Sequence, residues 1–229
     1  MPEKLFIATP VYERSLTLDY HTSAIETVAA CYREGISVYP NYVSSPLVGQ
    51  ARNILAARFL ATDCTHMLFV DSDIGWNPES VMRLLYAMRV SEDIEVLASC
   101  YPMKTYPLQF PVWLEHPPVQ HPLVPVVEAS HVPTGFLMLR RSAFERFAAA
   151  YPDLRCTFEK SGLPEQWSYF NCSVEDGKFY SEDYGFSRLF RRCGGRLWVD
   201  PEPVLKHVGN HDFVGRLADC FGAATAAER

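Results

Sequence analysis

The chain has 229 residues, and 48% of them are hydrophobic, which is normal for a packed globular protein. Its formal net charge of −6 argues against a broad nucleic-acid-binding surface, because phosphate binding depends on clustered Lys and Arg. No apolar run approaches the roughly 18 to 20 residues of a membrane span, and the first residues lack a secretory leader, so we expect a cytoplasmic protein.

The cysteines argue against a disulfide framework or a zinc site. There are seven of them, an odd number, and they are scattered without a CxxC pair. We therefore expect buried, reduced thiols.

Strands and helices are expected to alternate over the first hundred residues. Short apolar runs predict the strands, and apolar residues at helical spacing predict the helices. Such alternation predicts an α/β fold with a mostly parallel sheet that helices cover on both faces. The first expected strand starts at residue 4 and breaks at Thr9-Pro10, and the others span 36–43, 65–73 and 94–102. The expected helices span 17–35, 47–64 and 78–90.

The second part of the chain has a different character. Residues 102–133 are rich in proline, which predicts short strands and turns. Residues 152–181 lack clear periodicity and are expected to form a functional loop or lid that orders over a bound ligand. Ser181 is the expected N-cap of a helix, and a tail with two histidines starts at Lys206.

With no internal repeat and no linker, one domain over 1–229 is expected, with a ligand-binding half (1–101) and a mixed second half (102–229). Within the second half, a strand followed by a helix is expected over 134–147, and a last strand over 196–201.

The sequence Asp71-Ser72-Asp73 ends the third expected strand. The preceding Met67–Val70 is a continuous apolar run, as in a parallel strand buried on both faces. Ligands bind at the carboxyl ends of such strands, and two carboxylates are the ligand type that Mg²⁺ and Mn²⁺ prefer beside substrate phosphates. Acids that cap a turn before a proline-started helix would give the same pattern.

The ordered set of segments resembles GT-A-type glycosyltransferases, close to the family 2 enzymes and their short phage and bacterial relatives. It runs from residue 4 to residue 211 through IATPVYE, ARNILAARFL, THMLFVDSDIGWNPESVMRLL, VPTGFLMLRRSAFERF, SEDYGFSRLFRRCGGRLWVDP and KHVGNH. The resemblance implies a Rossmann-like GT-A fold and sugar transfer from a nucleotide-diphosphate donor, with a UDP-sugar favoured and Mn²⁺ or Mg²⁺ as cofactor.

The resemblance also implies a set of metal ligands. Asp73 matches the main protein ligand of the ion, and Asp71 matches the first acid, which lies near the ion and touches the donor ribose or sugar. His207 matches a late histidine that provides a third contact, and Mn²⁺ accepts such mixed ligands. His211 is a competing candidate, because both histidines would face one ion if their segment were helical. A structural histidine is the plain alternative.

Glu182 and Asp183 resemble an acidic pair at the head of a helix near the acceptor. The resemblance implies that Asp183 takes the proton from the acceptor hydroxyl and that Glu182 positions the acceptor, which gives inversion. The alternative is that both acids only complement the positive end of the helix. A late histidine ligand also occurs in retaining families, so the stereochemistry stays open at this point.

Further residues are implied in donor binding. Tyr12 is expected to stack on the nucleotide base, and Arg52 to offset diphosphate charge, with a surface salt bridge as its equal alternative. Gly135 leaves room for a sugar, although a turn or bulge would also explain it. The full set is Thr9, Pro10, Tyr12, Arg52, Asn53, Asp71, Ser72 and Gly135.

Two other functions compete with sugar transfer. One is a non-catalytic module that binds a sugar-nucleotide or a glycan. The other is a nucleotidyltransferase or phosphohydrolase, which the sequence supports less because it has no P-loop and no second cluster of acids. The sequence leaves open whether the acceptor is a glycan, a hydroxylated DNA base or a protein, and it leaves the oligomeric state open.

Overall fold

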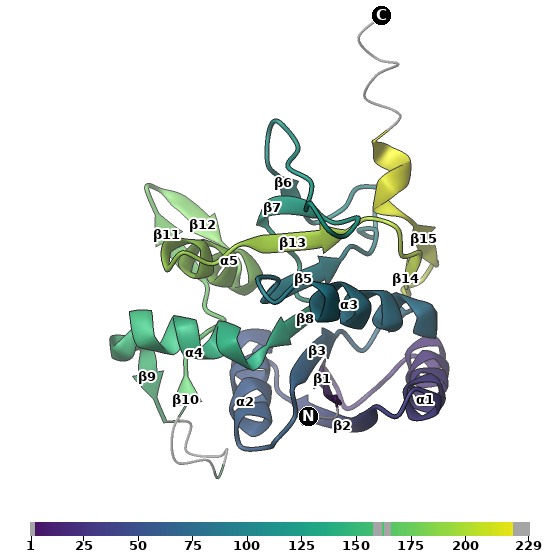
Figure 1. Cartoon of the computed structure of the whole chain (residues 1–229), viewed down its shortest axis with the longest axis horizontal. Helices are drawn as coiled ribbons and strands as arrows, with labels where there is room; N and C mark the ends of the chain where they lie inside the picture. Colours follow the sequence, from purple (N-terminus) through teal and green to yellow (C-terminus); the bar gives the residue numbers. More distant parts are fainter. Residues whose placement is uncertain (1–2, 158–161, 163–165, 222–229) are drawn as a thin grey trace, which may run out of the picture.

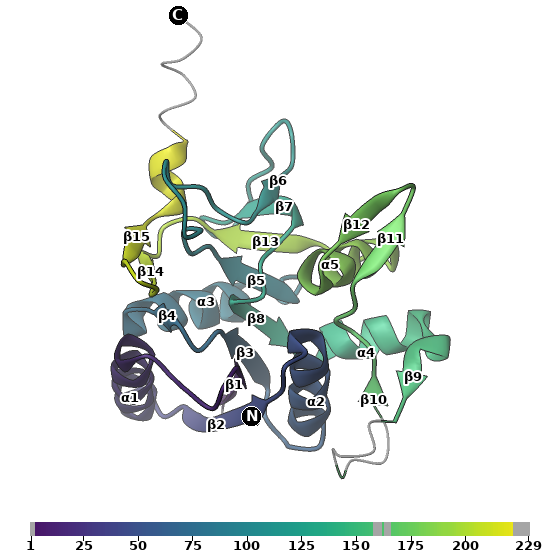
Figure 2. The same ribbon diagram turned by 180° about the vertical axis from the view of Figure 1, so that it is seen from behind.

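The computed structural model describes residues 3–157, 162 and 166–221. An eight-stranded sheet forms the centre of the molecule, in the order β2-β1-β3-β8-β5-β13-β7-β6 (Figures 1 and 2). In that order the strands are Ser37–Ser44, Lys4–Val11, His66–Val70, Phe136–Arg140, Val96–Ser99, Leu197–Asp200, Val127–His131 and Trp113–Leu114.

Most strands of this sheet point the same way. β1 runs parallel to β2 and β3, and β13 runs parallel to β5. β8 is antiparallel to both of its neighbours, β3 and β5, so these two share one direction, and β7 is antiparallel to β13. The expected fold class is therefore confirmed, and its unpredicted feature is the late strand β8 between two early strands.

Helices cover both faces of the sheet, because residues along the strands alternate between two cores. In β1, Leu5 and Ile7 pack with α1 and α3 on one face, whereas Phe6 and Ala8 pack with α2, α4 and α5 on the other (Figures 1 and 2). The helices are α1 Leu18–Arg33, α2 Val48–Leu60, α3 Pro78–Val90, α4 Arg141–Ala150 and α5 Glu182–Arg192.

The loop that carries Asp71 and Asp73 is short, because α3 begins soon after β3 ends. Asn77 is its N-cap and accepts a hydrogen bond from the Glu79 N–H, and Pro78 occupies the first turn, where its missing N–H costs nothing. Only residues 71–77 separate β3 from this helix. The acidic motif is thus held between two well-defined elements.

A small sheet brings the C-terminal segment to that loop. β4 (Ile74–Gly75) pairs with β14 (Leu205–His207), which pairs with β15 (Phe213–Gly215). The expected tail from Lys206 is wrong for the residues that the structure describes. Their backbone forms two strands of the small sheet and continues into the 3₁₀ helix η2 (Leu217–Cys220). The alanine-rich end, 222–229, lies outside the described residues.

The region expected to be a loop contains short secondary structure. It begins with the 3₁₀ helix η1 (Pro152–Leu154) and holds the hairpins β9–β10 (Arg155–Cys156, Gln166–Trp167) and β11–β12 (Ser173–Glu175, Lys178–Tyr180). Residues 158–161 and 163–165 of the expected lid lie outside the described part. Its ordering over a donor stays a prediction.

The cysteines follow their prediction only in part. All seven are free, and Cys31, Cys64 and Cys100 are buried, but Cys172 and Cys220 are exposed. Among the helices of the described residues, none combines the length and apolarity required to cross a membrane.

Candidate functional site

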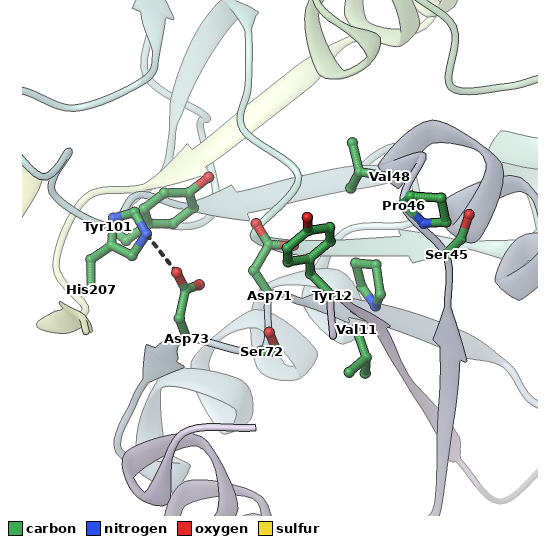
Figure 3. Close-up of a pocket in the computed structure, with 11 residues that line it drawn as sticks. Val11, Tyr12, Ser45, Pro46, Val48, Asp71, Ser72, Asp73, Tyr101 and His207 are labelled. Carbon is green, nitrogen blue, oxygen red and sulfur yellow. Dashed lines mark ion pairs between the residues drawn. The ribbon is translucent and has the colours of Figure 1, made fainter. Parts of the chain in front are cut away.

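A pocket of about 260 Å³ opens where β1, β2, β3 and β5 end (Figure 3). The carboxyl ends of strands that point the same way meet at one edge of a sheet, which is where α/β proteins bind ligands. Of the predicted site residues, the following line this pocket: Pro10, Tyr12, Asp71, Ser72, Asp73 and His207.

Asp71 is tied to a buried arginine. Its Oδ1 accepts a hydrogen bond from Arg52 Nη2 at 2.8 Å, and its backbone N–H donates to the Gly135 carbonyl at 3.1 Å. The Arg52 side chain is only 3% exposed, and its Nε lies 3.5 Å from Glu182 Oε1. Burial opposes the charge of Arg52, but the two carboxylates outweigh it and raise its pKa. Arg52 is therefore an internal ion-pair partner and not the surface residue of the alternative reading.

A residue without a side chain is required at Gly135, because the side chains of Tyr101 and Asp71 approach its backbone closely. A Cβ on this residue would lie 2.5 Å from Tyr101 Cε1 and 2.6 Å from Asp71 Oδ2. The space beside the glycine is therefore filled by the protein itself and leaves no room for a sugar there. Another contact of Gly135 with a donor stays a prediction.

Asp73 has a different environment from Asp71. Two side chains reach the same carboxylate oxygen, Oδ2. Lys104 Nζ lies 2.8 Å from it and His207 Nε2 lies 3.3 Å from it, and Figure 3 shows the contact between His207 and Asp73. Burial alone would raise the pKa of Asp73, but the hydrogen bonds from His207 and Lys104 lower it to about 2. Asp73 is thus a carboxylate over the whole physiological pH range.

The small sheet places His207 next to this carboxylate. His207 lies opposite Ile74 in the β14–β4 pairing, and the Val208 N–H donates to the Asp73 carbonyl at 2.8 Å. The His207 Nδ1 lies 2.9 Å from the Pro102 carbonyl oxygen. A proton on Nε2 is donated to Asp73 in this arrangement. With the proton on Nδ1 instead, His207 would satisfy the Pro102 carbonyl and leave the Nε2 lone pair free for an ion beside Asp73, which is how metal-binding histidines are commonly oriented.

The side chains of Asp73 and His207 fit a divalent ion whose remaining ligands come from a bound substrate and from water. Asp73 and His207 present the oxygen and imidazole nitrogen that Mn²⁺ accepts. Among the described residues, no three His, Cys, Asp or Glu side chains are grouped so as to hold a metal ion by themselves. Mg²⁺ and Mn²⁺ sites in nucleotide-binding proteins typically complete their shell with substrate phosphates and water, which this arrangement permits.

Two predicted donor-binding residues are buried and lie away from this pocket, although Asn53 lines a second pocket beside it. Thr9 is buried, and its Oγ1 lies 2.5 Å from Tyr20 Oη. Asn53 holds the backbone of Phe170, accepting from its N–H at 2.9 Å and donating to its carbonyl at 3.3 Å. Neither side chain lines the pocket in Figure 3, and their contact with a donor stays a prediction.

His211 is turned away from Asp73. Its Nε2 lies 2.7 Å from Tyr106 Oη, and its ring packs against Phe213 with 5.2 Å between centroids. The segment between the two histidines is a strand end and a turn, so the helical arrangement in which both would face one ion does not occur. The structure favours His207 over His211.

The acidic pair lies in the first turn of α5, as expected. Glu182 lines a second pocket of about 440 Å³, which shares Pro46 and Val48 with the first. Burial raises the pKa of Glu182, although Arg52 opposes this. Asp183 Oδ1 accepts hydrogen bonds from Ser181 Oγ and from the Tyr184 N–H, at 2.8 Å for the latter. Ser181 is the N-cap of α5, as predicted, and Asp183 lies in its first turn. The catalytic role of Asp183 stays a prediction.

Sequence reasoning missed two residues of the site. Tyr101 lines the pocket with its ring centroid 5.0 Å from that of His207, and burial together with Asp71 raises its pKa well above the ordinary value. Lys104 holds Asp73 from the loop after β5. The available signal was position, because Tyr101 lies at the carboxyl end of the strand predicted over 94–102 and Lys104 follows it.

Comparison with known proteins shows the fold. The structure of A197 from STIV has a TM-score of 0.56 and 15% identity, over 93% of this chain and 93% of that chain. No protein-family model and no curated protein matches the sequence.

Glycosyltransferases are among the similar solved structures. One is involved in glycosylation of the major capsid of PBCV-1, with a TM-score of 0.38 and 15% identity over 63% of this chain and 62% of that one. Another is a mutant Drosophila β-1,4-galactosyltransferase 7 in complex with manganese, UDP-Gal and xylobiose. Its TM-score is 0.39 and its identity 14%, over 86% of this chain and 63% of that one.

Proposed function

We propose that the protein is a metal-dependent glycosyltransferase that moves a sugar from a nucleotide-diphosphate donor, UDP-sugars being favoured, to an acceptor hydroxyl with inversion. One observation carries the proposal. The pocket at the strand ends contains both acids of the Asp71-Ser72-Asp73 motif, and a strand from the far end of the chain brings His207 next to Asp73. The sequence resemblance supports the same assignment.

The donor half of the site follows from the pocket lining. Asp73 and His207 would hold Mn²⁺ or Mg²⁺, which, when bound, neutralises the charge that develops on the departing nucleoside diphosphate. Asp71, positioned by Arg52, would face the donor sugar or ribose. Tyr12 is 64% exposed at the pocket mouth, so its ring is free to stack on the nucleotide base.

The acceptor half follows from the first turn of α5. Hydrogen bonds from Ser181 and Tyr184 orient the Asp183 carboxylate through Oδ1. Its other oxygen would take the proton from the acceptor hydroxyl while that hydroxyl oxygen bonds to the anomeric carbon. The bond between the anomeric carbon and the diphosphate oxygen breaks in the same step, and the electron pair leaves with the nucleoside diphosphate.

Calorimetry with UDP, GDP, CDP and ADP, each with and without Mn²⁺, tests the donor half. We expect one nucleotide to bind more tightly with Mn²⁺ than without it in the wild type, and we expect Asp73→Ala to lose this gain from Mn²⁺. Asp212→Ala is the matched control, because Asp212 is a nearby acid whose partner is Lys206. No binding of any of the four nucleotides would refute the proposal.

Transfer is tested separately from binding. The nucleotide found by calorimetry selects the sugar-nucleotides for hydrolysis and transfer assays. We expect Asp183→Asn to bind the donor as the wild type does and to lose turnover. Binding without any turnover in the wild type would instead indicate the non-catalytic sugar-nucleotide-binding module.

A further inference from the structure

A lysine occupies the side of Asp73 at which a cation is expected. Lys104 Nζ lies 2.8 Å from Asp73 Oδ2, the same oxygen that faces His207 Nε2 at 3.3 Å. Lys104 therefore brings an ammonium group to the place where the diphosphate of the donor would meet the protein. No sequence motif assigned a role to this residue.

The segment that carries Lys104 is fixed at points on both sides of the lysine. The Pro102 carbonyl is bonded to His207, and Tyr106 packs on His211 and Phe213. Between them, the stem of Lys104 passes over Gly209, where a Cβ would lie 3.2 Å from Lys104 Cδ. Its position beside Asp73 is thus defined by the fold of two segments.

The contact between Lys104 and Asp73 is nevertheless easy to exchange. The side chains are 39% and 33% exposed, and such exposed pairs contribute little to stability because water and salt screen them. A nearby lysine is held more firmly: Lys206 bonds to both Asp19 and Asp212 at 2.8 Å. Lys104 is therefore the lysine that can move to another anion at low cost.

We propose that Lys104 binds the donor diphosphate, exchanging Asp73 for a phosphate oxygen, and that it supports weak nucleoside-diphosphate binding even without a divalent ion. This inference rests on the proposed function, since it assigns a further diphosphate ligand beside Asp73, one of the residues that line the pocket. Lysine is a common phosphate ligand that acts as a point charge. The diphosphate would then be neutralised from two directions, by Lys104 and by the ion beside Asp73 and His207.

Calorimetry on Lys104→Met, Lys104→Arg and Lys206→Met tests the inference, with UDP, GDP, CDP and ADP as probes in Mn²⁺ and in EDTA. We expect Lys104→Met to weaken binding about tenfold or more in Mn²⁺, as for loss of a charge-assisted hydrogen bond, and to abolish binding in EDTA. Lys104→Arg should keep most of the affinity. Lys206→Met, which removes the same charge at the same end of the molecule, should bind as the wild type does.

Gly209→Ala provides a second variant that keeps the lysine. The added Cβ would press on the stem of Lys104, so we expect a smaller loss of nucleotide affinity than in Lys104→Met. Wild-type affinity in Lys104→Met, or tighter binding, would mean that Lys104 only occupies Asp73 and would overturn the inference while the proposed function stands. Absence of nucleotide binding in the wild type with Mn²⁺ would overturn both.

Discussion

The two acids of one short motif have different surroundings in this protein. Asp71 is bonded to Arg52, which is 3% exposed and also faces Glu182. Asp73 is bonded to Lys104, whose side chain is 39% exposed, and to a histidine from the C-terminal segment. One side of the pocket is therefore built from an internal ion network, and the other from contacts at the protein surface.

This difference separates two tasks. A buried charge that loses its partner is costly, so the Asp71 side keeps one geometry. An exposed ion pair is weak, so the groups around Asp73 can exchange partners when a ligand enters. We therefore expect substitutions on the Asp71 side to change folding stability, and substitutions on the Asp73 side to change ligand binding.

The largest expected effect is that of Arg52→Met, which leaves the Asp71 and Glu182 carboxylates without their cation. We expect a loss of about 3 kcal/mol in the free energy of unfolding, measured by urea denaturation. Arg58→Met on the same helix is the control, because Arg58 donates at an exposed position to the Tyr42 carbonyl. Equal stability of the two variants would contradict the internal network.

The same substitution at two glycines compares the two sides directly. Gly135→Ala places a methyl group 2.5 Å from Tyr101 Cε1, and overpacking of this kind costs about 1 to 3 kcal/mol. Gly209→Ala approaches only the flexible stem of Lys104, at 3.2 Å, so its cost should be smaller. Thermal unfolding of both variants measures the contrast, and the reverse order would show that the Asp73 side is the more rigid one.

A third prediction concerns pH. Burial raises the pKa of Glu182 above its ordinary value of 4.5, so folding disfavours its charged form. The neutral Glu182 carboxyl thus adds to the free energy of unfolding. This stabilisation is fully present below pH 4.5 and is lost as the pH rises through the folded-state pKa. Glu182→Gln should therefore be more stable than the wild type at pH 7, and the difference should vanish in unfolding curves near pH 4. A constant difference at all pH values would exclude this cause.

The smallest effect on stability is expected for Lys104→Met, within about 1 kcal/mol at neutral pH. The pKa of Asp73 is lowered to about 2, so its pairing stabilises the fold above the ordinary pKa of 3.8 and is lost as the pH falls towards 2. Asp73→Asn should remove this acid dependence, which urea denaturation between pH 5 and pH 2 would detect. A loss of several kcal/mol in Lys104→Met would place this side in the internal network.

The sequence predicts those features of the site that depend on neighbouring residues. The apolar run Met67–Val70 gives β3, and Asn77 with Pro78 gives the start of α3, so the position of Asp71 and Asp73 at a strand end follows from local patterns. Their place in a pocket follows from the rule for strand ends in α/β sheets.

The remaining features depend on contacts between distant segments. Nothing in the local pattern of 205–207 predicts its pairing with β4, and the position of His207 depends on that pairing. Arg52 lies in a helix whose run from Ala51 to Ala57 is buried throughout, so no polar face distinguishes an internal arginine from a surface one. Lys104 lies in a proline-rich stretch without periodicity and meets Asp73 only through tertiary structure.

The place of β8 between β3 and β5 has a consequence for synthesis of the protein. When the first hundred residues have been synthesised, the segments of β3 and β5 are present, but β8 (Phe136–Arg140), which pairs with both, is not yet made. Unpaired strand edges are prone to aggregate, and a domain generally folds as one unit, so it needs all the strands of its sheet. A fragment truncated after residue 101 should therefore be insoluble. The pocket is completed only when 205–207 has also been translated, because His207 lines it.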